Sequence, residues 1–396
     1  MLKGTDCMAV LVENKLLFNE IIEKAKRIGE AAELEALQAD QNATISENIA
    51  NIIRNENIHR LILPKEYGYP QLDWRTFVDM VSTVGYYNLS AAWLTYFFSV
   101  HNAWVSYLPK PLRDEIVNQG GFVADVFAPI GQVEKCEGGY YVSGKYNFVS
   151  GINYCDWVGV GAMMKFDDSE KPERVGICLK VSDLEVVKNW DSLGLRGSGS
   201  NTLIVDKVFV KPESILRFSK MIECSQPPEK GFDQDYLYYN TPFYPGFYVG
   251  FAAMAVGGAE RVLQEFEKHT AGRIRFSGVV EKESPTSQRV LAELSIEMES
   301  AKALLNQYIV MMEQDKGGPY EGARYKAIRA AIIDKCVNIG VKSLLTLGGH
   351  ALLKGHPVEL FARDLIAIAT HITSLYEDGI YGYGRHLFGI KTGIQG

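Results

Sequence analysis

The pattern of apolar and polar positions divides the chain into three regions. From about residue 10 to 119, apolar residues recur every three or four positions, which is typical of α-helices. Between 121 and 215, apolar and polar residues alternate and are separated by turns rich in Gly, Asp and Lys, as in short β-strands. From 245 onward, helical spacing returns. The pattern predicts an α+β protein with helices first, strands in the middle and long helices last.

Local signals refine these regions. Ser46, followed by Glu47 and an apolar run, predicts a helix start. One stripe of apolar residues, repeated at three and four positions, predicts a long helix: Leu291, Leu294, Met298, Ala301, Leu305 and Tyr308. Gly348 and Gly349 should end the next helix. The predicted divisions are a helical domain, a β domain, a connection and a helical bundle, at residues 1–120, 121–217, 218–244 and 245–396.

Composition excludes several classes of protein. The 396 residues are 47% hydrophobic and 22% charged, as in ordinary folded proteins, and the net charge of −7 argues against a nucleic-acid partner. The uncharged stretches 80–109 and 241–259 are interrupted by polar residues, proline or glycine, so we expect buried helices and not membrane spans. Six cysteines without a CxxC pair predict reduced thiols in a cytoplasmic protein.

Familiar nucleotide-binding and catalytic motifs are missing. The glycines of GLRGSGSN at 194–201 do not fit GxGxxG and precede a predicted strand, which disfavours a Rossmann-type nicotinamide enzyme. The sequence has no Walker loop, no HExxH and no GxSxG. His350 and His356 lie six positions apart near a proline and a double glycine. We expect them in an exposed loop and predict no metal site.

Six segments, in order, resemble the acyl-CoA dehydrogenase superfamily over nearly the whole chain. They are LPKEYGY (63–69), SVHNAW (99–104), YNFVSGINYCDWVGVGA (146–162), WDSLGLRGSGSNTLIVDKVFV (190–210), GRIRFSG (272–278) and LGGHALLKGHPVELFARD (347–364). The resemblance implies an N-terminal helical domain, a middle β-barrel-like domain and a C-terminal four-helix bundle. It also implies a homotetramer in which a flavin lies between the β domain and the bundle and is partly completed by a neighbouring subunit.

Departures from the family pattern indicate a subfamily. The loop that carries G-S-D in the dehydrogenases corresponds here to 127–133, where G-S-D is absent. The position of the usual glutamate base, about eight residues after Arg363-Asp364, falls on His371. With RGSGSN and VHN, this arrangement resembles the two-component flavin-dependent monooxygenases of the same fold. The resemblance implies an enzyme that uses reduced FMN or FAD and O₂ to oxygenate a small, aromatic substrate, with a separate reductase as partner.

The resemblance also implies roles for individual residues. His371, Ser150 and His101 would be catalytic, with the Ser150 hydroxyl at the flavin N5–O4 edge and His101 lining the substrate pocket. The residues expected to bind the cofactor are Phe127, Phe148, Ser150, Arg273, Arg275, Gly348 and Gly349. Trp157 is an alternative to Phe148 beside the flavin ring. Leu345 replaces a glutamine common in FAD-dependent relatives, so FMN and FAD both stay open.

The histidine changes the chemistry expected of the site. Removing the α-proton of an acyl thioester needs a carboxylate base, whereas a histidine can exchange a proton with a phenol or peroxide near neutral pH. One alternative is an acyl-CoA dehydrogenase that binds FAD permanently and uses Glu377 as a displaced base. Another is a non-catalytic flavin-fold binding protein, which the presence of Ser150, Arg273 and the double glycine disfavours.

Overall fold

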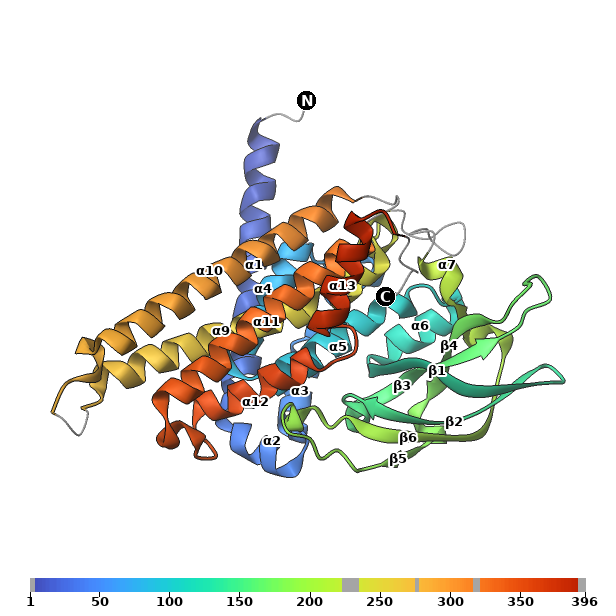
Figure 1. The fold of residues 1–396 in the computed structure, drawn as a ribbon. Helices are drawn as coiled ribbons and strands as arrows, with labels where there is room; N and C mark the ends of the chain where they lie inside the picture. Colours follow the sequence, from blue (N-terminus) through green and yellow to red (C-terminus); the bar gives the residue numbers. More distant parts are fainter. Residues whose placement is uncertain (1–3, 223–234, 275–277, 316–320, 391–396) are drawn as a thin grey trace.

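A computed structural model describes residues 4–222, 235–274, 278–315 and 321–390. Two groups of helices lie side by side, and a bent β-sheet lies at one end of them (Figure 1). The predicted order of helices, strands and long helices is confirmed. Within the described residues, none of the helices combines the length and apolar character needed to cross a membrane.

The first helical group surrounds one fully buried helix. Its members are α1 (Gly4–Leu34), α2 (Ala36–Asn42), α3 (Glu47–Asn55), α4 (Trp74–Tyr87), α5 (Leu89–Val105) and α6 (Lys110–Gln119). Ser46 caps α3, as predicted, by accepting a hydrogen bond from Ile49 N–H. Every residue of α5 is buried, so the uncharged stretch belongs to the protein core and is packed on all sides.

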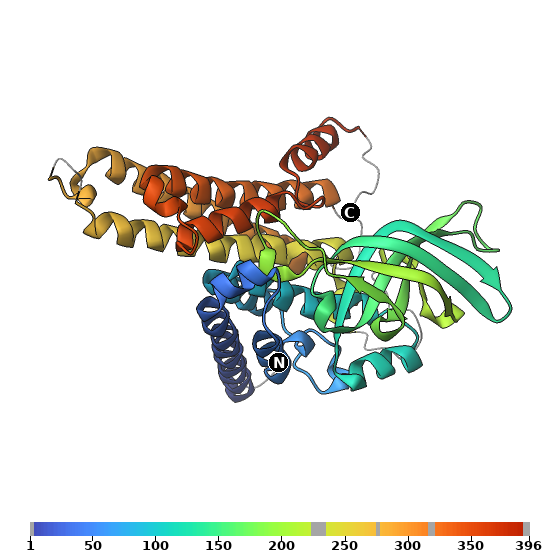
Figure 2. The same cartoon turned by 90° about the horizontal axis from the view of Figure 1, so that it is seen from below.

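The middle region is a seven-stranded sheet in the order β5-β6-β2-β1-β3-β4-β7. The strands are β1 (Phe122–Cys136), β2 (Gly139–Val149), β3 (Cys155–Met164), β4 (Glu173–Lys180), β5 (Glu185–Val187), β6 (Asn201–Val210) and β7 (Ile215–Arg217). The first half of β1 pairs in parallel with β3, and its second half pairs antiparallel with β2. Because β1 changes partner along its length, the sheet curves around it (Figure 2).

The last region contains the long helices that cover the buried face of the first group. After the short α7 (Phe218–Ile222) and α8 (Leu237–Asn240) come α9 (Phe243–Gly272), α10 (Pro285–Gln314), α11 (Gly322–Leu347), α12 (Pro357–Ala369) and α13 (Tyr376–Leu387). The predicted apolar stripe lies on α10, where Leu294, Met298 and Tyr308 are buried. Helix α11 ends at Gly348, as predicted.

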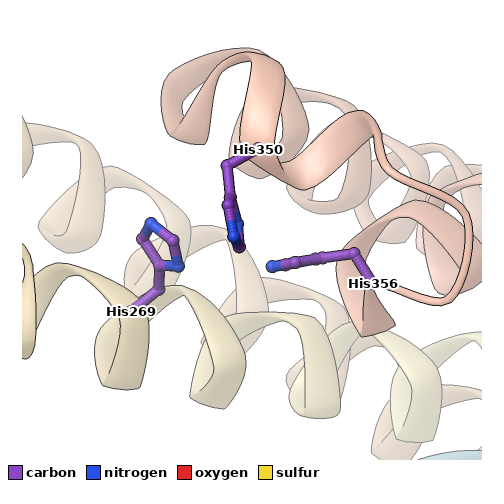
Figure 3. A group of neighbouring side chains, drawn as sticks. All are labelled: His269, His350 and His356. Carbon is purple, nitrogen blue, oxygen red and sulfur yellow. The ribbon is translucent and has the colours of Figure 1, made fainter.

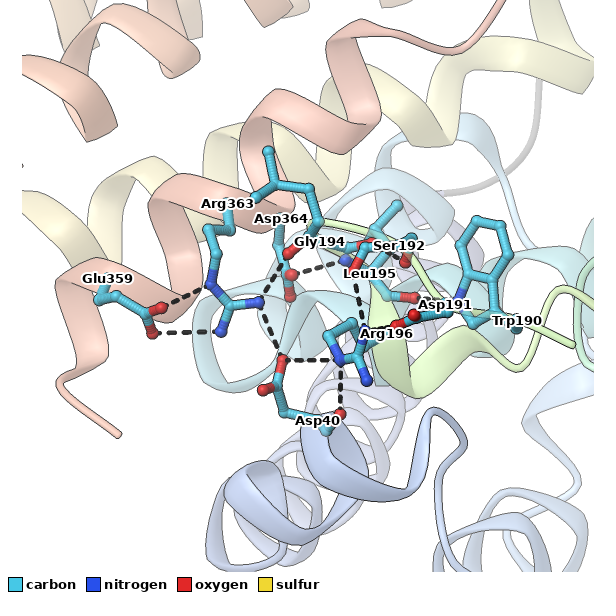
Figure 4. Close-up of polar contacts among 11 residues, drawn as sticks. Asp40, Trp190, Asp191, Ser192, Gly194, Leu195, Arg196, Glu359, Arg363 and Asp364 are labelled. Carbon is cyan, nitrogen blue, oxygen red and sulfur yellow. Dashed lines mark hydrogen bonds and ion pairs between the residues drawn. The ribbon is translucent and has the colours of Figure 1, made fainter. Parts of the chain in front are cut away.

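A polar cluster ties α2, the β5–β6 connection and α12 together (Figure 4). Arg363 donates to both carboxylate oxygens of Glu359, to the Leu193 carbonyl and to Asp40. The Asp364 carboxylate accepts the Leu195 backbone N–H at 2.6 Å. These bonds hold the β5–β6 connection against α12. They thereby also position Ser198 and Ser200, which lie further along the same connection.

Candidate active site

The Ser150 hydroxyl lies in a chain of buried hydrogen bonds. It accepts the indole N–H of Trp93 at 2.9 Å, and its Oγ lies 2.8 Å from Ser200 Oγ. Ser200 Oγ is in turn 2.8 Å from Ser198 Oγ. When Ser200 donates to Ser150, Ser150 accepts two hydrogen bonds and keeps its own proton for a ligand.

The turn that carries Ser150 is locally strained. Phe148, two positions before the serine, has a left-handed backbone with φ of 65°. The register between β2 and β6 shifts at this point, between Tyr146 and Val149. The Gly151 N–H, directly after the serine, donates to the Ser198 carbonyl at 3.0 Å. Strain held in place by surrounding bonds is common where a backbone presents functional groups.

His371 follows α12 and lies against the ring of Trp93. Its ring centroid is 5.7 Å from Trp93 and 4.7 Å from Phe251. Its Nδ1 lies 2.9 Å from the Thr373 hydroxyl. Removal from water, with a smaller contribution from the Arg329 guanidinium, lowers the pKa of His371 to about 4. At neutral pH the site therefore contains a neutral imidazole.

Arg329, on α11, supports the turn that carries His371. Its side chain is buried, and it donates to the Thr373 carbonyl at 2.5 Å. Its guanidinium also lies 5.0 Å from the centre of the Tyr248 ring. Among the described residues, no carboxylate forms an ion pair with Arg329, and its Nε has no hydrogen-bond partner. A buried cation without a counter-ion favours neutral His371.

His101 lies deeper in the same region, on α5. Its Nδ1 is 2.6 Å from the Val123 carbonyl, so this nitrogen carries the proton and donates it. Its Nε2 is 3.3 Å from Asp125 Oδ2. Within the described part of the chain, these two buried atoms have no hydrogen-bond partner. Burial raises the pKa of Asp125, so the pair can share a proton or bind a ligand hydroxyl.

Aromatic rings connect the two histidines. Phe97 lies 5.0 Å from His101, 4.9 Å from Trp93 and 5.8 Å from Phe251, measured between ring centroids. His371 contacts the same Trp93 and Phe251 rings. Ser150, His371 and His101, which sequence analysis placed in three separate segments, therefore border one aromatic cluster. This arrangement suits a flat apolar ligand that carries a polar group.

The rings expected beside the flavin differ in position. The Phe148 side chain is 71% exposed, next to Ser150. The Phe127 ring, on β1, packs between Trp104 of α5 and Phe218 of α7, at 5.4 and 4.9 Å, so it contributes to the packing of the sheet against these helices. Trp157, the predicted alternative to Phe148, is buried and donates to Gln119 at 2.8 Å. Of the three, Phe148 is the ring available to a cofactor.

The remaining residues predicted to bind the cofactor, Arg273 and the double glycine, form a second, separate group. Arg273 follows α9 and donates to the Leu347 carbonyl at 3.0 Å, which brings it next to the double glycine. Gly348 has φ of 74° and ψ of −158°, a combination that glycine adopts without strain. A side chain on Gly348 or Gly349 would meet no atom of another described residue within 4 Å, so the described part of the chain leaves space beside both. Arg275 lies outside the described residues.

Comparisons with known proteins agree with this architecture. Residues 249–374 match the family model of the acyl-CoA dehydrogenase C-terminal domain. The p-hydroxyphenylacetate 3-hydroxylase oxygenase component of Acinetobacter baumannii is 26% identical over 383 residues, which cover 94% of this chain and 89% of that protein. XiaF from Streptomyces sp., solved with FADH2 and glycerol, superposes with a TM-score of 0.88 at 18% identity over 98% of this chain and 99% of that one.

This chain has the acyl-CoA dehydrogenase fold. A further structure of this fold, TdsC from Paenibacillus sp. A11-2 with FMN and indole, has a TM-score of 0.78 at 16% identity and covers 93% of this chain and 97% of that one. The predicted fold class and the resemblance to flavin-dependent oxygenases are thereby confirmed.

Within this fold, Glu377 is a poor substitute for the missing carboxylate base. It lies in the first turn of α13, beyond His371, and its side chain is exposed. A base for α-proton removal works when it is held over the substrate in a dry pocket. The group that borders the aromatic cluster is instead the neutral imidazole of His371.

Several residues of the site carry no recognisable sequence signal. Trp93 joins Ser150 to His371, Asp125 faces His101, and Arg329 supports the Thr373 carbonyl. Trp93 and Arg329 lie in segments with ordinary helical spacing, and a residue that only fills the core would show the same sequence pattern. Ser198 and Ser200 could have been predicted from the sequence, because both belong to the RGSGSN segment.

Proposed function

We propose that this chain is the oxygenase component of a two-component flavin-dependent monooxygenase that acts on a small aromatic substrate. The observation that carries the proposal is the neutral His371 imidazole, joined through Trp93 to the Ser150 hydroxyl, at the place where a dehydrogenase needs a carboxylate. The 26% identical relative from Acinetobacter baumannii, named as such an oxygenase component, supports the same conclusion.

The described residues fit a flavin at two places. The exposed Phe148 ring and the Ser150 hydroxyl suit the flat ring system, and Arg273 with the open Gly348 backbone suits a phosphate. Reduced flavin, FMN or FAD, supplies the electrons and the activation of O₂ when it is bound. The solved neighbours that contain FADH2 and FMN support either form.

The residues of this chain then position groups and protons. Ser150, which accepts hydrogen bonds from Trp93 and Ser200, can donate its own proton to the flavin edge. The Thr373 hydroxyl and backbone N–H face His371 Nδ1, at 2.9 and 3.4 Å. When Nδ1 accepts these bonds, the proton of the neutral ring lies on Nε2. His371 can therefore donate toward the reacting oxygen without first taking a proton from solvent.

His101 and Asp125 are placed to recognise the substrate. His101 Nε2 and Asp125 Oδ2, which have no hydrogen-bond partner among the described residues, lie 3.3 Å apart at the edge of the aromatic cluster, so a phenolic hydroxyl could bridge them. Such a bridge would satisfy both buried atoms and let the pair take up the phenolic proton. Phe97 and Phe247, which lie 5.0 and 6.1 Å from His101, would pack against the ring of the substrate.

The same proposal includes the assembly and its partners. Helix α9 is continuous from Phe251, beside His371, to Gly272, which precedes Arg273. At about 1.5 Å per residue, these 21 positions span roughly 30 Å, too far for one FMN to touch both ends. We therefore propose a homotetramer in which Arg273 of one copy serves the flavin of another, together with a separate reductase. A cytoplasmic location, also proposed, accords with the free thiols of Cys155, Cys178 and Cys336.

The test compares reduced with oxidised flavin. The purified full-length protein is titrated anaerobically with reduced and oxidised FMN and FAD, and we expect the reduced forms to bind more tightly. The reduced complex is then mixed with isotopically labelled O₂ and a series of phenols and indoles, and one labelled oxygen should enter a product. Permanent binding of oxidised FAD, with acyl-thioester dehydrogenation that disappears in Glu377→Gln, would overturn the proposal.

A further inference from the structure

Three histidines from separate elements converge at the end of the bundle (Figure 3). His269 lies near the end of α9, His350 in the short 3-10 helix after α11, and His356 at the start of α12. Each offers one ring nitrogen, and these nitrogens all lie within 4.8 Å of one another. His350 and His356 are close in sequence, and the structure adds His269, 81 positions before His350.

The surroundings of the three rings leave nitrogens available to a ligand. His269 Nε2 is buried and has no hydrogen-bond partner among the described residues. His350 is exposed, and its ring centroid lies 5.5 Å from each of the other two. Partial burial and the neighbouring positive groups lower the pKa values of His269 and His356, which favours the neutral form that binds metals.

We propose that His269, His350 and His356 bind one divalent transition-metal ion, with Zn²⁺ as the expected ion. Imidazole nitrogens are preferred ligands of Zn²⁺, and three of them leave a fourth position for water. Ligand nitrogens around a tetrahedral zinc lie about 3.4 Å apart, so the rings must close slightly. The exposed His350 side chain has the freedom to make this movement.

Charge around the three rings is mixed. Arg273 lies close enough to His269 to lower its pKa, and this cation opposes a bound metal. The carboxylate of Glu281 acts to raise the pKa of His269, and those of Glu265 and Glu359 act to raise the pKa of His356. The carboxylates offset the arginine, so a divalent ion is not placed in a purely positive field.

His356 has a second task that a metal would change. Its Nδ1 accepts the Val358 N–H at 3.2 Å and so caps α12. A neutral ring that binds zinc through Nε2 carries its proton on Nδ1, so the long capping bond would be lost on binding. The ion would replace this cap with a link between α9, the connection after α11, and α12, beside Gly348 and Gly349.

The experiment uses the tag-free, full-length protein after dialysis against a chelator. Zn²⁺ is titrated by calorimetry, and Co²⁺ is added separately to record the visible spectrum of a tetrahedral site. We expect one ion per chain and a tetrahedral cobalt spectrum. His350→Ala should weaken binding more than about a hundredfold, beyond the usual cost of losing an outer-shell partner. His386→Ala, which removes a histidine from α13, should bind as the wild type does.

Further measurements distinguish a loss of zinc affinity from unfolding and from the binding of an anion at the same place. Circular dichroism should show that His350→Ala stays folded, since His350 is exposed; His269→Gln provides a second variant whose loss of zinc affinity supports the site. Equal zinc affinity in wild type and both variants would overturn the proposal. It would also be overturned if inorganic phosphate, and not Zn²⁺, raised the Tm of the wild type and this rise disappeared in His350→Ala. Because no flavin or substrate is added, the result does not depend on the proposed oxygenase activity.

Discussion

The two groups of candidate residues are built in opposite ways. Around Ser150 and His371, side chains from three regions of the chain meet at the buried Trp93, which donates to Ser150 and packs against the half-buried His371 ring. Around Arg273 and Gly348, the backbone is open, and the bond from Arg273 goes to a main-chain carbonyl. The first group is complete within one chain and can set pKa values and proton positions. The second is exposed, and under the proposed assembly a flavin held between two subunits would complete it.

The largest effect should come from breaking the buried group. His371→Ala should lower the rate of product formation by about 10²–10⁴-fold, the usual contribution of a positioned acid or base. Affinity for reduced flavin should change little, because Ser150 and Arg273 are untouched. The measurement is product yield per reduced flavin, with His386→Ala as control. Product formation at the wild-type rate in His371→Ala would remove this residue from the mechanism.

A smaller effect should follow from changing the open group. Arg273→Ala should weaken flavin binding by about 1.5–3 kcal/mol, as expected for a lost charge-assisted hydrogen bond. The fold should persist because Arg273 is exposed. Flavin affinity is measured by fluorescence titration, and Arg289→Ala, an exposed arginine on α10 paired with Glu293, serves as control. Unchanged affinity would point to Arg275 as the next residue to test.

A third, pH-dependent effect concerns the stability contributed by Asp364, in the polar cluster that joins α2, the β5–β6 connection and α12. Burial raises the pKa of Asp364 from 3.8 to about 7, despite the hydrogen bond from Leu195 N–H. The folded state therefore holds this proton more tightly than the unfolded state does. Its stabilising contribution is complete below pH 3.8 and is lost as the pH rises to about 7, by up to roughly 1.4 kcal/mol per pH unit.

Asp364→Asn keeps an oxygen that can accept the Leu195 N–H but removes the titration. The free energy of unfolding of the wild type, relative to this variant, should fall between pH 4 and 7 and stay constant above that. Urea denaturation at several pH values measures the difference. Comparison with the variant is needed because His59 and His371 have the opposite effect on stability. Their pKa values are lowered in the folded state, so they reduce the free energy of unfolding as the pH falls below 6.5. A difference that does not change with pH would show that folding does not raise the pKa of Asp364.

His269, His350 and His356 meet through tertiary contacts that a sequence pattern does not reveal. His350 and His356 are close in sequence, and an exposed loop was a reasonable expectation for two histidines beside glycines. His350 is indeed exposed, but His356 is partly buried and caps α12. His269, on another helix, approaches them because Arg273 donates to the Leu347 carbonyl and α9 ends beside α12. A spacing pattern within one segment cannot contain that information.

The sequence by itself determined the order of the regions, the apolar stripe on α10, the cap of α3 and the end of α11 at Gly348. These features depend on local periodicity and on the backbone preferences of single residues. Its ordered motifs also pointed to Ser150, His371, His101 and Arg273. The tertiary structure alone decided that Trp93 joins Ser150 to His371, that Phe127 packs against α5 and Trp157 donates to Gln119 of α6, and that Arg273 lies roughly 30 Å of helix away from Phe251. Such contacts depend on which faces of distant elements meet. Packing of the whole chain, and no local preference, sets them.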